Sequence, residues 1–270
     1  MKVWTNTNTL DGLIDDLVIT SSKQEAEVAL LGSKPITLDE FPNLKGIFRA
    51  GVGSDNVPIE EAKKRGIKVE FPSEKTINFI LEETANFACY LIMRMLYINV
   101  GSLSPWEKYN RSFLGNRKLL IIGKGKIGTM VMNKLGSMLK ILTYDVSINS
   151  QDELEQMIKD ADCISLHIPA SPENKGFFGA SKLSLMKNGA SLINTARGSV
   201  VDEDALFKEL ESERIYAAFD VYWKEPYEGK LKKFHPDRFF MTPHVASTCD
   251  EFLRGSAEDL RKLVQKLKNI

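Results

Sequence analysis

The chain has 270 residues, and its 36 Lys and Arg residues balance 36 Asp and Glu residues, so its formal net charge is zero. A neutral chain has no global attraction to nucleic acid or to an anionic membrane, and no run of about 18 apolar residues predicts a membrane span. Hydrophobic residues make up 43% of the chain, which is typical of a soluble globular protein, and the length predicts about two domains.

Cysteine usage and the first residues of the chain bear on the cellular compartment. Cys89, Cys163 and Cys249 are odd in number and far apart. We therefore expect reduced thiols in a cytoplasmic protein and neither a disulfide framework nor a zinc site. The first residues lack the apolar core of a secretory signal.

In the first third of the chain, short apolar runs alternate with turn or helical segments. This alternation predicts a small parallel sheet. A helix is predicted over 76–97, and because it is apolar nearly all round we expect it to be buried between layers. Segment 99–116 carries Gly and Pro among polar residues and is expected to be a connection. The apolar runs lie near Val3 and at 17–20, 28–31, 46–50 and 67–71.

The second part of the chain contains six apolar runs with helical stretches between most of them, which predicts a doubly wound dinucleotide-binding sheet. Ser150 with Glu153 has the spacing of a capping box at a helix start, and Asp202 is a good cap for another helix. Thr248 with Glu251 repeats the capping-box spacing before the final helix. The six runs lie at 119–122, 141–144, 163–168, 190–194, 215–219 and 239–242.

These patterns predict an α/β protein with two domains. Residues 89–246 are expected to form a Rossmann-type doubly wound parallel sheet. The C-terminal helix is too short to be a domain, so we expect it to pack on the first part of the chain. Residues 1–88 and 247–270 would then form a smaller flavodoxin-like α/β domain. The chain would cross twice between the domains and leave a cleft between them.

The sharpest local signal is a Gly-x-Gly-x-x-Gly motif between an apolar run at 117–122 and a helical pattern at 129–139. Gly123 permits a tight turn, Gly125 permits close approach of a pyrophosphate, and Gly128 lets the helix pack near the strand. Lys126 and Ile127 would offer backbone N–H groups to the phosphates at the helix N-terminus. A glycine-rich turn without a ligand is the alternative, and the flanking strand and helix argue against it.

Asp145 ends the next apolar run and fits the acid that accepts hydrogen bonds from the adenosine ribose hydroxyls. Its charge would repel a 2′-phosphate, and residues 146–148 contain no Arg or Lys that would bind one. The sequence therefore predicts NAD in preference to NADP.

Only three histidines are present, and their positions differ. His167 ends an apolar run, which favours a hydrogen-bonded structural residue or a residue lining a cofactor site. His235 lies in a polar loop and is expected at the surface. His244 follows the last apolar run at the predicted domain junction, where a ligand cleft belongs. It is the candidate acid–base residue, and a junction histidine held by hydrogen bonds is the alternative.

Arg197 and Glu225 also follow predicted strands, at the edge where open α/β sheets bind ligands. Arg197 could clamp a carboxylate with two parallel hydrogen bonds, or it could cap a helix or pair with a surface acid. Glu225 could pair with the ring of His244 and orient it, or it could be one more solvated acid. No compact cluster of His, Cys and Asp predicts a metal site.

Together these residues resemble the D-isomer-specific 2-hydroxyacid dehydrogenase family. Segment 49–61 (RAGVGSDNVPIEE) is similar to the family's substrate loop, closest to that of phosphoglycerate dehydrogenases. Lys124 in the glycine motif departs from the family, and the segment between Asp145 and His167 is trimmed. The first domain is also shorter than usual, which leaves the substrate open. The other matching segments are 123–128 with Asp145, 165–169, 187–204 (KNGASLINTARGSVVDED), 217–226 (AAFDVYWKEP) and 242–248 (TPHVAST).

The resemblance implies a role for each matching residue. It makes Arg197 the group that binds and polarises a 2-oxo acid, and His244, paired with Glu225, the acid–base catalyst. Backbone N–H groups near Val52 and Gly53 would receive the substrate carboxylate. The remaining matches would lie beside the cofactor: His167, Pro169, Thr195, Ala196 and Asp220.

The expected activity is hydride transfer between NAD and a small D-2-hydroxy acid or its 2-oxo acid, without a metal. Glycerate, glycolate, lactate and 3-phosphoglycerate all stay open, with Arg49 and Lys75 as candidate phosphate contacts. The resemblance also implies a homodimer. The alternative is a non-catalytic regulatory or scaffold protein of the same fold that senses NAD(H), as the C-terminal binding protein corepressors do.

Overall fold

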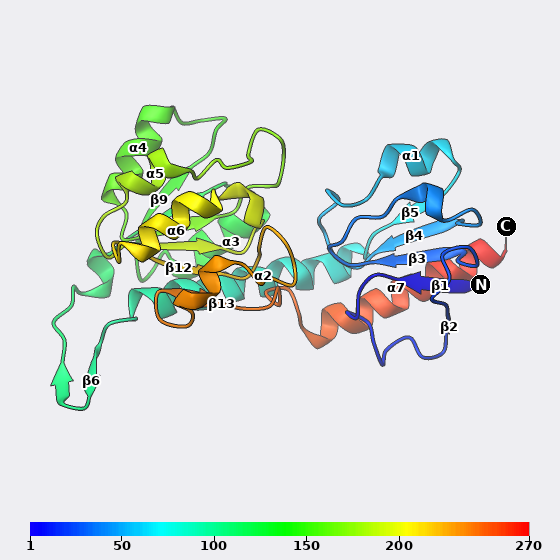
Figure 1. The fold of residues 1–270 in the computed structure, drawn as a ribbon, viewed down its shortest axis with the longest axis horizontal. Coiled ribbons are helices and arrows are strands. Elements are labelled where there is room, and N and C mark those ends of the chain that lie inside the picture. Colours follow the sequence, from blue (N-terminus) through cyan, green and yellow to red (C-terminus); the bar gives the residue numbers. More distant parts are fainter. Residues whose placement is uncertain (270) are drawn as a thin grey trace. The chain divides into compact units, whose positions relative to one another are not determined.

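The computed structural model describes residues 1–269 and divides the chain into two compact units (Figure 1). Unit 1 comprises Met1–Leu81 and Ser247–Ile270, and unit 2 comprises Glu82–Ala246. None of the helices within residues 1–269 has the length and hydropathy needed to cross a membrane.

Unit 1 contains a five-stranded, wholly parallel sheet with the order β2-β1-β3-β4-β5. This is the strand order of flavodoxin-like folds, in which the direction of winding reverses beside the first strand. The predicted small parallel sheet is therefore confirmed. Its strands are β1 (Lys2–Thr5), β2 (Val18–Ile19), β3 (Val28–Leu31), β4 (Gly46–Arg49) and β5 (Lys68–Glu70).

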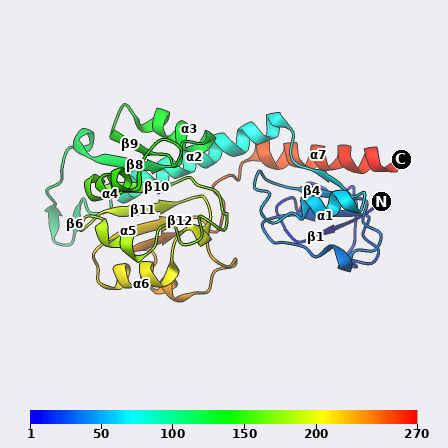
Figure 2. The same cartoon turned by 90° about the horizontal axis from the view of Figure 1, so that it is seen from above.

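Helices cover both faces of this sheet (Figure 2). Val28 and Leu30 point to one face, where they pack with Leu260 of α7 (Asp250–Lys268). Leu31 points to the other face, near α1 (Ile59–Lys64) and the 3₁₀ helix η1 (Leu38–Glu40). Alternate residues of a strand point to opposite faces, so short apolar strands supply both cores. The expectation that the C-terminal helix packs on the first part of the chain is confirmed.

The predicted start of α7 is wrong. The helix begins at Asp250, its N-cap is Cys249, and no side chain caps it. Thr248 lies one residue too early for its hydroxyl to serve as the N-cap acceptor.

Helix α2 (Glu74–Leu96) runs from unit 1 into unit 2. In unit 1 the carboxylate of Asp259 accepts hydrogen bonds from Ser73 N at 2.7 Å and Thr76 Oγ1 at 3.0 Å, which caps the start of the helix. The expectation that α2 is buried, because it is apolar nearly all round, is wrong: an exposed stripe at helical spacing comprises Glu82, Asn86, Tyr90 and Arg94.

Unit 2 contains a six-stranded, wholly parallel sheet with the order β13-β12-β11-β10-β8-β9. The order reverses between β8 and β10, so the sheet is doubly wound as predicted. Its strands are β8 (Lys118–Ile122), β9 (Lys140–Tyr144), β10 (Cys163–Leu166), β11 (Ser191–Asn194), β12 (Tyr216–Phe219) and β13 (Phe239–Met241).

The two faces of this sheet carry separate helix layers (Figure 2). Leu119 and Ile121 of β8 pack toward α2 and α3 (Lys126–Leu135). Leu120 and Ile122 pack toward α4 (Gln151–Asp160), α5 (Ala180–Leu185) and α6 (Glu203–Glu211). A parallel sheet buried on both faces explains why its strands are continuous apolar runs. The remaining short helices are η2 (Leu114–Asn116), η3 (Gly198–Val200) and η4 (Lys230–Phe234).

Two predicted caps of unit 2 are confirmed. Ser150 and Glu153 form a reciprocal capping box at the start of α4. The carboxylate of Asp202 accepts a hydrogen bond from Ala205 N at 2.8 Å at the start of α6.

Segment 99–116 is more ordered than the expected connection, because β6 (Gly101–Leu103) and β7 (Trp106–Lys108) pair as an antiparallel hairpin.

We predict that Asp259→Ala lowers the free energy of unfolding by about 1–3 kcal/mol, because Ser73 N and the buried Thr76 hydroxyl both lose their acceptor. Burial alone would raise the pKa of Asp259, but hydrogen bonds from Ser73, Lys262 and Thr76 hold it below its ordinary value. The contribution is therefore present at neutral pH and is lost as the pH falls through that lowered pKa. Denaturant unfolding at several pH values measures it.

The exposed neighbour Glu258→Ala is the matched control on the same helix. The difference between wild type and Asp259→Ala should shrink in acid, below about pH 4. A difference that stays constant from neutral to acid pH would contradict the capping role of the ionised carboxylate.

Candidate active site

The candidate residues of unit 2 gather along one edge of its sheet. Because all six strands are parallel, their carboxyl ends share an edge, and the loops that leave this edge carry the predicted residues. The glycine motif follows β8, and His167 follows β10, so both lie where the strand order reverses. This reversal is the usual ligand position in open α/β sheets.

The glycine motif is built from close backbone contacts. Gly123 has a φ of +100°, and a Cβ at this position would lie 2.5 Å from the carbonyl oxygen of His167. A Cβ on Gly128 would overlap the carbonyl oxygen of Gly123, while a Cβ on Gly125 would meet nothing within 4 Å. The motif thus brings α3 close to β8 and leaves open space beside Gly125. The N–H of Thr129 bonds to Gly125 O at 3.0 Å, so the N–H groups of Lys126 and Ile127 precede the hydrogen-bonded turns of α3.

Asp145 lies half-buried at the end of β9, beside this motif. Its Oδ1 accepts hydrogen bonds from Ser147 Oγ at 2.6 Å and Ser147 N at 3.0 Å, and its Oδ2 lies 3.4 Å from Lys124 N. The bonds from Ser147 lower the pKa of Asp145, so the group is a carboxylate at neutral pH. Oδ2 has remaining capacity to accept hydrogen bonds.

His167 is held inside the loop that follows β10. Its Nε2 lies 2.9 Å from Ser165 Oγ, and burial lowers its pKa to about 4. The ring is therefore neutral near pH 7, which suits the predicted structural or lining role and not proton donation. Pro169 follows in the same loop, and its carbonyl oxygen accepts a hydrogen bond from Asn174 Nδ2 at 3.0 Å.

The turn after β11 carries Thr195, Ala196 and Arg197. The fully buried Asn194 holds this turn, since its side chain accepts from Ala196 N at 3.0 Å and donates to Arg197 O at 2.9 Å. Arg197 Nη1 donates to Ala196 O at 2.8 Å, and the side chain is half-buried. Among residues 1–269, Thr195 Oγ1 is one of two buried side-chain oxygen or nitrogen atoms without a hydrogen-bond partner.

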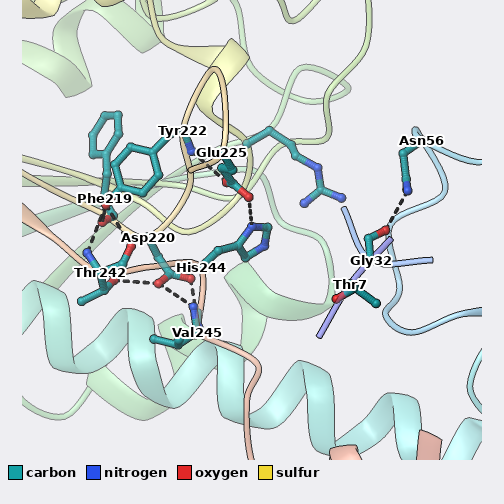
Figure 3. A network of polar contacts seen from close by, with 12 residues as sticks. Thr7, Gly32, Asn56, Phe219, Asp220, Tyr222, Glu225, Thr242, His244 and Val245 are labelled. Carbon is teal, nitrogen blue, oxygen red and sulfur yellow. Dashed lines mark hydrogen bonds and ion pairs between the residues drawn. The ribbon is translucent and has the colours of Figure 1, made fainter. Parts of the chain in front are cut away.

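The structure brings Glu225 and His244 together (Figure 3). Glu225 Oε2 lies 2.7 Å from His244 Nδ1, and Tyr222 N donates to Glu225 Oε1 at 3.1 Å. The two side chains are 23% and 32% exposed, so the pair is accessible without being fully solvated. A carboxylate on Nδ1 fixes the ring and leaves Nε2 as the atom that can exchange a proton with a ligand.

His244 has a φ of +55°, a left-handed backbone conformation that is costly for a residue other than glycine. The buried carboxylate of Asp220 holds the chain on both sides of it: Oδ1 accepts from Thr242 Oγ1 at 2.6 Å and Val245 N at 2.9 Å, and Oδ2 accepts from Ala246 N at 2.9 Å. Burial raises the pKa of Asp220, although these donors oppose that shift. The Asp220 side chain therefore anchors the turn that presents His244 (Figure 3).

The sequence argument missed three residues of this network: Asn194, Tyr222 and Thr242. Asn194 bonds within its own turn. Tyr222 and Thr242 make part-buried hydrogen bonds between separate loops. No spacing rule signals the contacts between loops, although a polar residue at the end of an apolar strand was a usable hint for Asn194 and Thr242.

Val52 and Gly53 lie in unit 1, in the loop after β4. Arg49 stabilises this loop by hydrogen bonds. Its guanidinium donates to Ala50 O and, at 3.2 Å, to Asn56 Oδ1, and the residue is only 7% exposed. Gly51 has a φ of +147°, and a Cβ there would press on the same guanidinium. The sequence offered Arg49 as a phosphate contact, whereas the structure uses it to shape the loop.

Comparisons with known proteins place these features in one family. The NAD-binding domain of D-isomer-specific 2-hydroxyacid dehydrogenases matches residues 101–246, and the catalytic domain of the same enzymes matches residues 15–72. The hydroxypyruvate reductase of Thermotoga maritima is 31% identical, and the match covers 94% of this chain and 85% of the relative. The glyoxylate reductase of Thermococcus litoralis is 33% identical, covering 83% and 74%.

A solved structure shares the fold over the whole chain. The D-lactate dehydrogenase of Aquifex aeolicus, determined with NAD and lactic acid, has a TM-score of 0.78, is 26% identical, and is matched over 100% of this chain and 96% of its own. The residues present fit NAD: the space beside Gly125, the exposed start of α3 and the ionised Asp145 match a pyrophosphate and a ribose diol.

We predict that Asp145→Ala weakens NADH binding by roughly tenfold or more, because two charge-assisted hydrogen bonds to the ribose are lost. NADPH binding should stay unchanged or improve, because the repulsion of a 2′-phosphate is removed. Fluorescence titration with each nucleotide measures both affinities. Asp152→Ala, an exposed acid on α4, is the control, and an equal loss for the two nucleotides would refute the discriminating role of Asp145.

Proposed function

Since the chain belongs to the D-isomer-specific 2-hydroxyacid dehydrogenases, a family of NAD-dependent oxidoreductases, we propose that it interconverts a small D-2-hydroxy acid and its 2-oxo acid. His244 is the acid–base catalyst, Glu225 its partner, and Arg197 the substrate-binding cation. The observation that carries this proposal is the 2.7 Å contact between His244 Nδ1 and Glu225 Oε2. Bound NAD supplies the hydride acceptor, and NADH the hydride donor.

The protein's own groups handle the proton and the substrate charge. In reduction, protonated His244 gives its Nε2 proton to the oxygen that develops negative charge, while Glu225 keeps the proton on Nδ1. In oxidation, neutral His244 takes that proton back. The Asp220 anchor supports this role, since it holds the turn carrying His244 before any ligand arrives.

Arg197 would bind the substrate carboxylate and stabilise the charge on the reacting oxygen. A guanidinium presents donors in a planar fork that matches a carboxylate and an adjacent oxygen. The Asn194 amide orders the turn that carries Arg197, which limits the conformational cost of placing its side chain. The neutral His167 would line the cofactor site without taking part in proton transfer.

The substrate proposed here is a short, unphosphorylated 2-oxo acid such as glyoxylate or hydroxypyruvate. The named activities of the Thermotoga and Thermococcus relatives support this choice. Arg49 supports it as well, because its guanidinium is buried and bonded within the loop that would receive the substrate carboxylate through Val52 and Gly53.

We further propose that residues 1–88 and 247–270 act as the substrate domain and residues 89–246 as the cofactor domain, in a cytoplasmic enzyme with unpaired cysteines.

The alternative, an NAD(H)-sensing scaffold without catalysis, is not favoured. The similar proteins are named as reductases and dehydrogenases. A protein that only senses the nucleotide does not need a histidine whose ring is hydrogen-bonded to a carboxylate at the end of a strand. The geometry of Glu225 and His244 therefore supports catalysis.

We predict that His244→Gln lowers kcat for glyoxylate or hydroxypyruvate reduction by about 10²–10⁴-fold, because proton donation is lost. NADH affinity should stay within about twofold, since the imidazole acts on the substrate oxygen. Steady-state NADH oxidation and fluorescence titration measure the two quantities. His235→Gln is the control and should keep full activity, because the His235 ring accepts a hydrogen bond from Met241 N at 3.1 Å and not from a proposed catalytic residue.

Wild-type protein should be assayed with glyoxylate, hydroxypyruvate, pyruvate and 3-phosphohydroxypyruvate. Binding of NADH without turnover of any of the four would argue for the sensing alternative. Full activity in His244→Gln would contradict the acid–base assignment while leaving the reaction class intact.

We also propose that the protein is a homodimer whose contact includes the β6–β7 hairpin. Leu103 and Trp106 on this hairpin are 82% and 79% exposed. A two-stranded hairpin with an uncovered apolar face is only marginally stable in water, so a second copy of the chain is its expected cover.

We predict that light scattering gives twice the mass of one chain for the wild type, and that the double variant Leu103→Ser/Trp106→Ser shifts the population to monomer. Met138→Ser, which changes a 40% exposed side chain elsewhere on unit 2, is the control. A monomeric wild type at micromolar concentration would refute this assembly.

A further inference from the structure

The spacing between Glu225 and His244 is not set by the sheet. The last pair in the ladder between β12 and β13 is Phe219 with Met241, followed by a bond from Thr242 N to Phe219 O at 3.1 Å. Beyond this point the two strands continue as separate loops, one carrying Glu225 and the other His244. Contacts between the two loops must therefore hold them at a distance that permits the 2.7 Å bond, and the Asp220 carboxylate supplies three of them.

The Tyr222 hydroxyl lies where the two loops separate, between Phe219 and Thr242, and we call this place the fork (Figure 3). The hydroxyl lies 2.8 Å from Phe219 O and 2.9 Å from Thr242 O, and it can donate a hydrogen bond to either carbonyl oxygen. It also accepts a hydrogen bond from Thr242 N at 3.1 Å. Burial raises the pKa of Tyr222, so the phenol keeps its proton as a donor at working pH. One hydroxyl thus bonds to the ends of both strands.

The backbone of Tyr222 reaches the other parts of the site. Its N–H donates to Glu225 Oε1 at 3.1 Å, which leaves Oε2 directed at His244. A Cβ on Gly198 would overlap the Tyr222 carbonyl group, so the turn that carries Arg197 packs directly against the same residue. Tyr222 therefore contacts all three loops that bear the proposed catalytic groups.

We propose that Tyr222 is a positioning residue for the acid–base pair, and that its hydroxyl, together with the Asp220 carboxylate, sets the separation of the Glu225 and His244 loops. This inference rests on the proposed function, because the pair it positions is the proposed proton donor. Tyr222 itself touches neither substrate nor cofactor in this role. A phenylalanine would fill the same volume and leave the carbonyl of Thr242 without the phenol donor.

The neighbouring Tyr227 provides a matched control. Its ring stacks on Tyr222 with centroids 5.0 Å apart, while its hydroxyl points elsewhere, donating to Glu203 Oε1 at 2.6 Å and accepting from Leu231 N at 3.2 Å. Tyr227→Phe therefore removes a hydroxyl of the same kind from the same aromatic cluster without touching the fork. A purely structural effect should be alike in the two variants.

The kinetic experiment compares Tyr222→Phe with Tyr227→Phe and wild type. Tyr222→Phe should lower kcat by about tenfold, because a small displacement of a proton donor is costly, with the KM for NADH unchanged. Tyr227→Phe should keep kcat within about twofold. Thermal unfolding should show similar small losses for both variants, which separates positioning from stability.

A second readout does not depend on activity. The chain has only three histidines, so long-range ¹H–¹⁵N spectra of the imidazoles can be assigned with His167→Gln and His235→Gln variants. We expect the His244 Nδ1 signal to show a carboxylate-bonded N–H in wild type and Tyr227→Phe, and to change in Tyr222→Phe.

Unchanged His244 signals together with an unchanged kcat in Tyr222→Phe would overturn the proposal. Equal effects of the two substitutions on both readouts would also overturn it. Failure of the wild type to reduce any 2-oxo acid would count against the proposed function alone, because the imidazole spectra would still decide whether Tyr222 positions the pair.

Discussion

The buried carboxylate of Asp220 is the contact on which the rest of the site depends. A carboxylate in a protein interior is costly unless donors surround it, and here three donors from residues 242–246 do so. These bonds stabilise the left-handed backbone of His244, which would otherwise relax. The same three hydrogen bonds thus offset both the burial of the carboxylate and the unfavourable φ angle, and the imidazole is held in place before a ligand binds.

Parallel strand packing explains why so many functional groups meet at one edge. Every strand of the six-stranded sheet ends at the same edge, so the loops that follow these strands lie along that edge. Apolar residues on both faces hold the strands in place. Buried side chains at the strand ends, such as Asn194, then hydrogen-bond to the loops and order them. The same principle operates in unit 1, where Arg49 and Asn56 shape the loop that follows β4.

Local patterns predicted the elements well wherever the deciding contacts were local. The strands of both sheets and the caps at Ser150 and Asp202 depend on residues within a few positions of each other. The errors have other causes. The start of α7 differs by one residue from the predicted cap, and element boundaries are the least certain part of a sequence prediction. The polar stripe on α2 and the β6–β7 hairpin are local in the sequence, and the prediction gave too little weight to the polar positions among the apolar ones.

The amino-acid sequence by itself determined the two α/β units, the glycine motif after β8 and the acid after β9, because each requires a residue type at a fixed local spacing. Tertiary structure alone decided that Glu225 and His244, 19 positions apart, lie within hydrogen-bond distance. It also decided that the Tyr222 hydroxyl lies between two strand ends, and that Arg49 turns inward. The reason is that strand order and register, which are set by the packing of the whole sheet, determine which loops become neighbours.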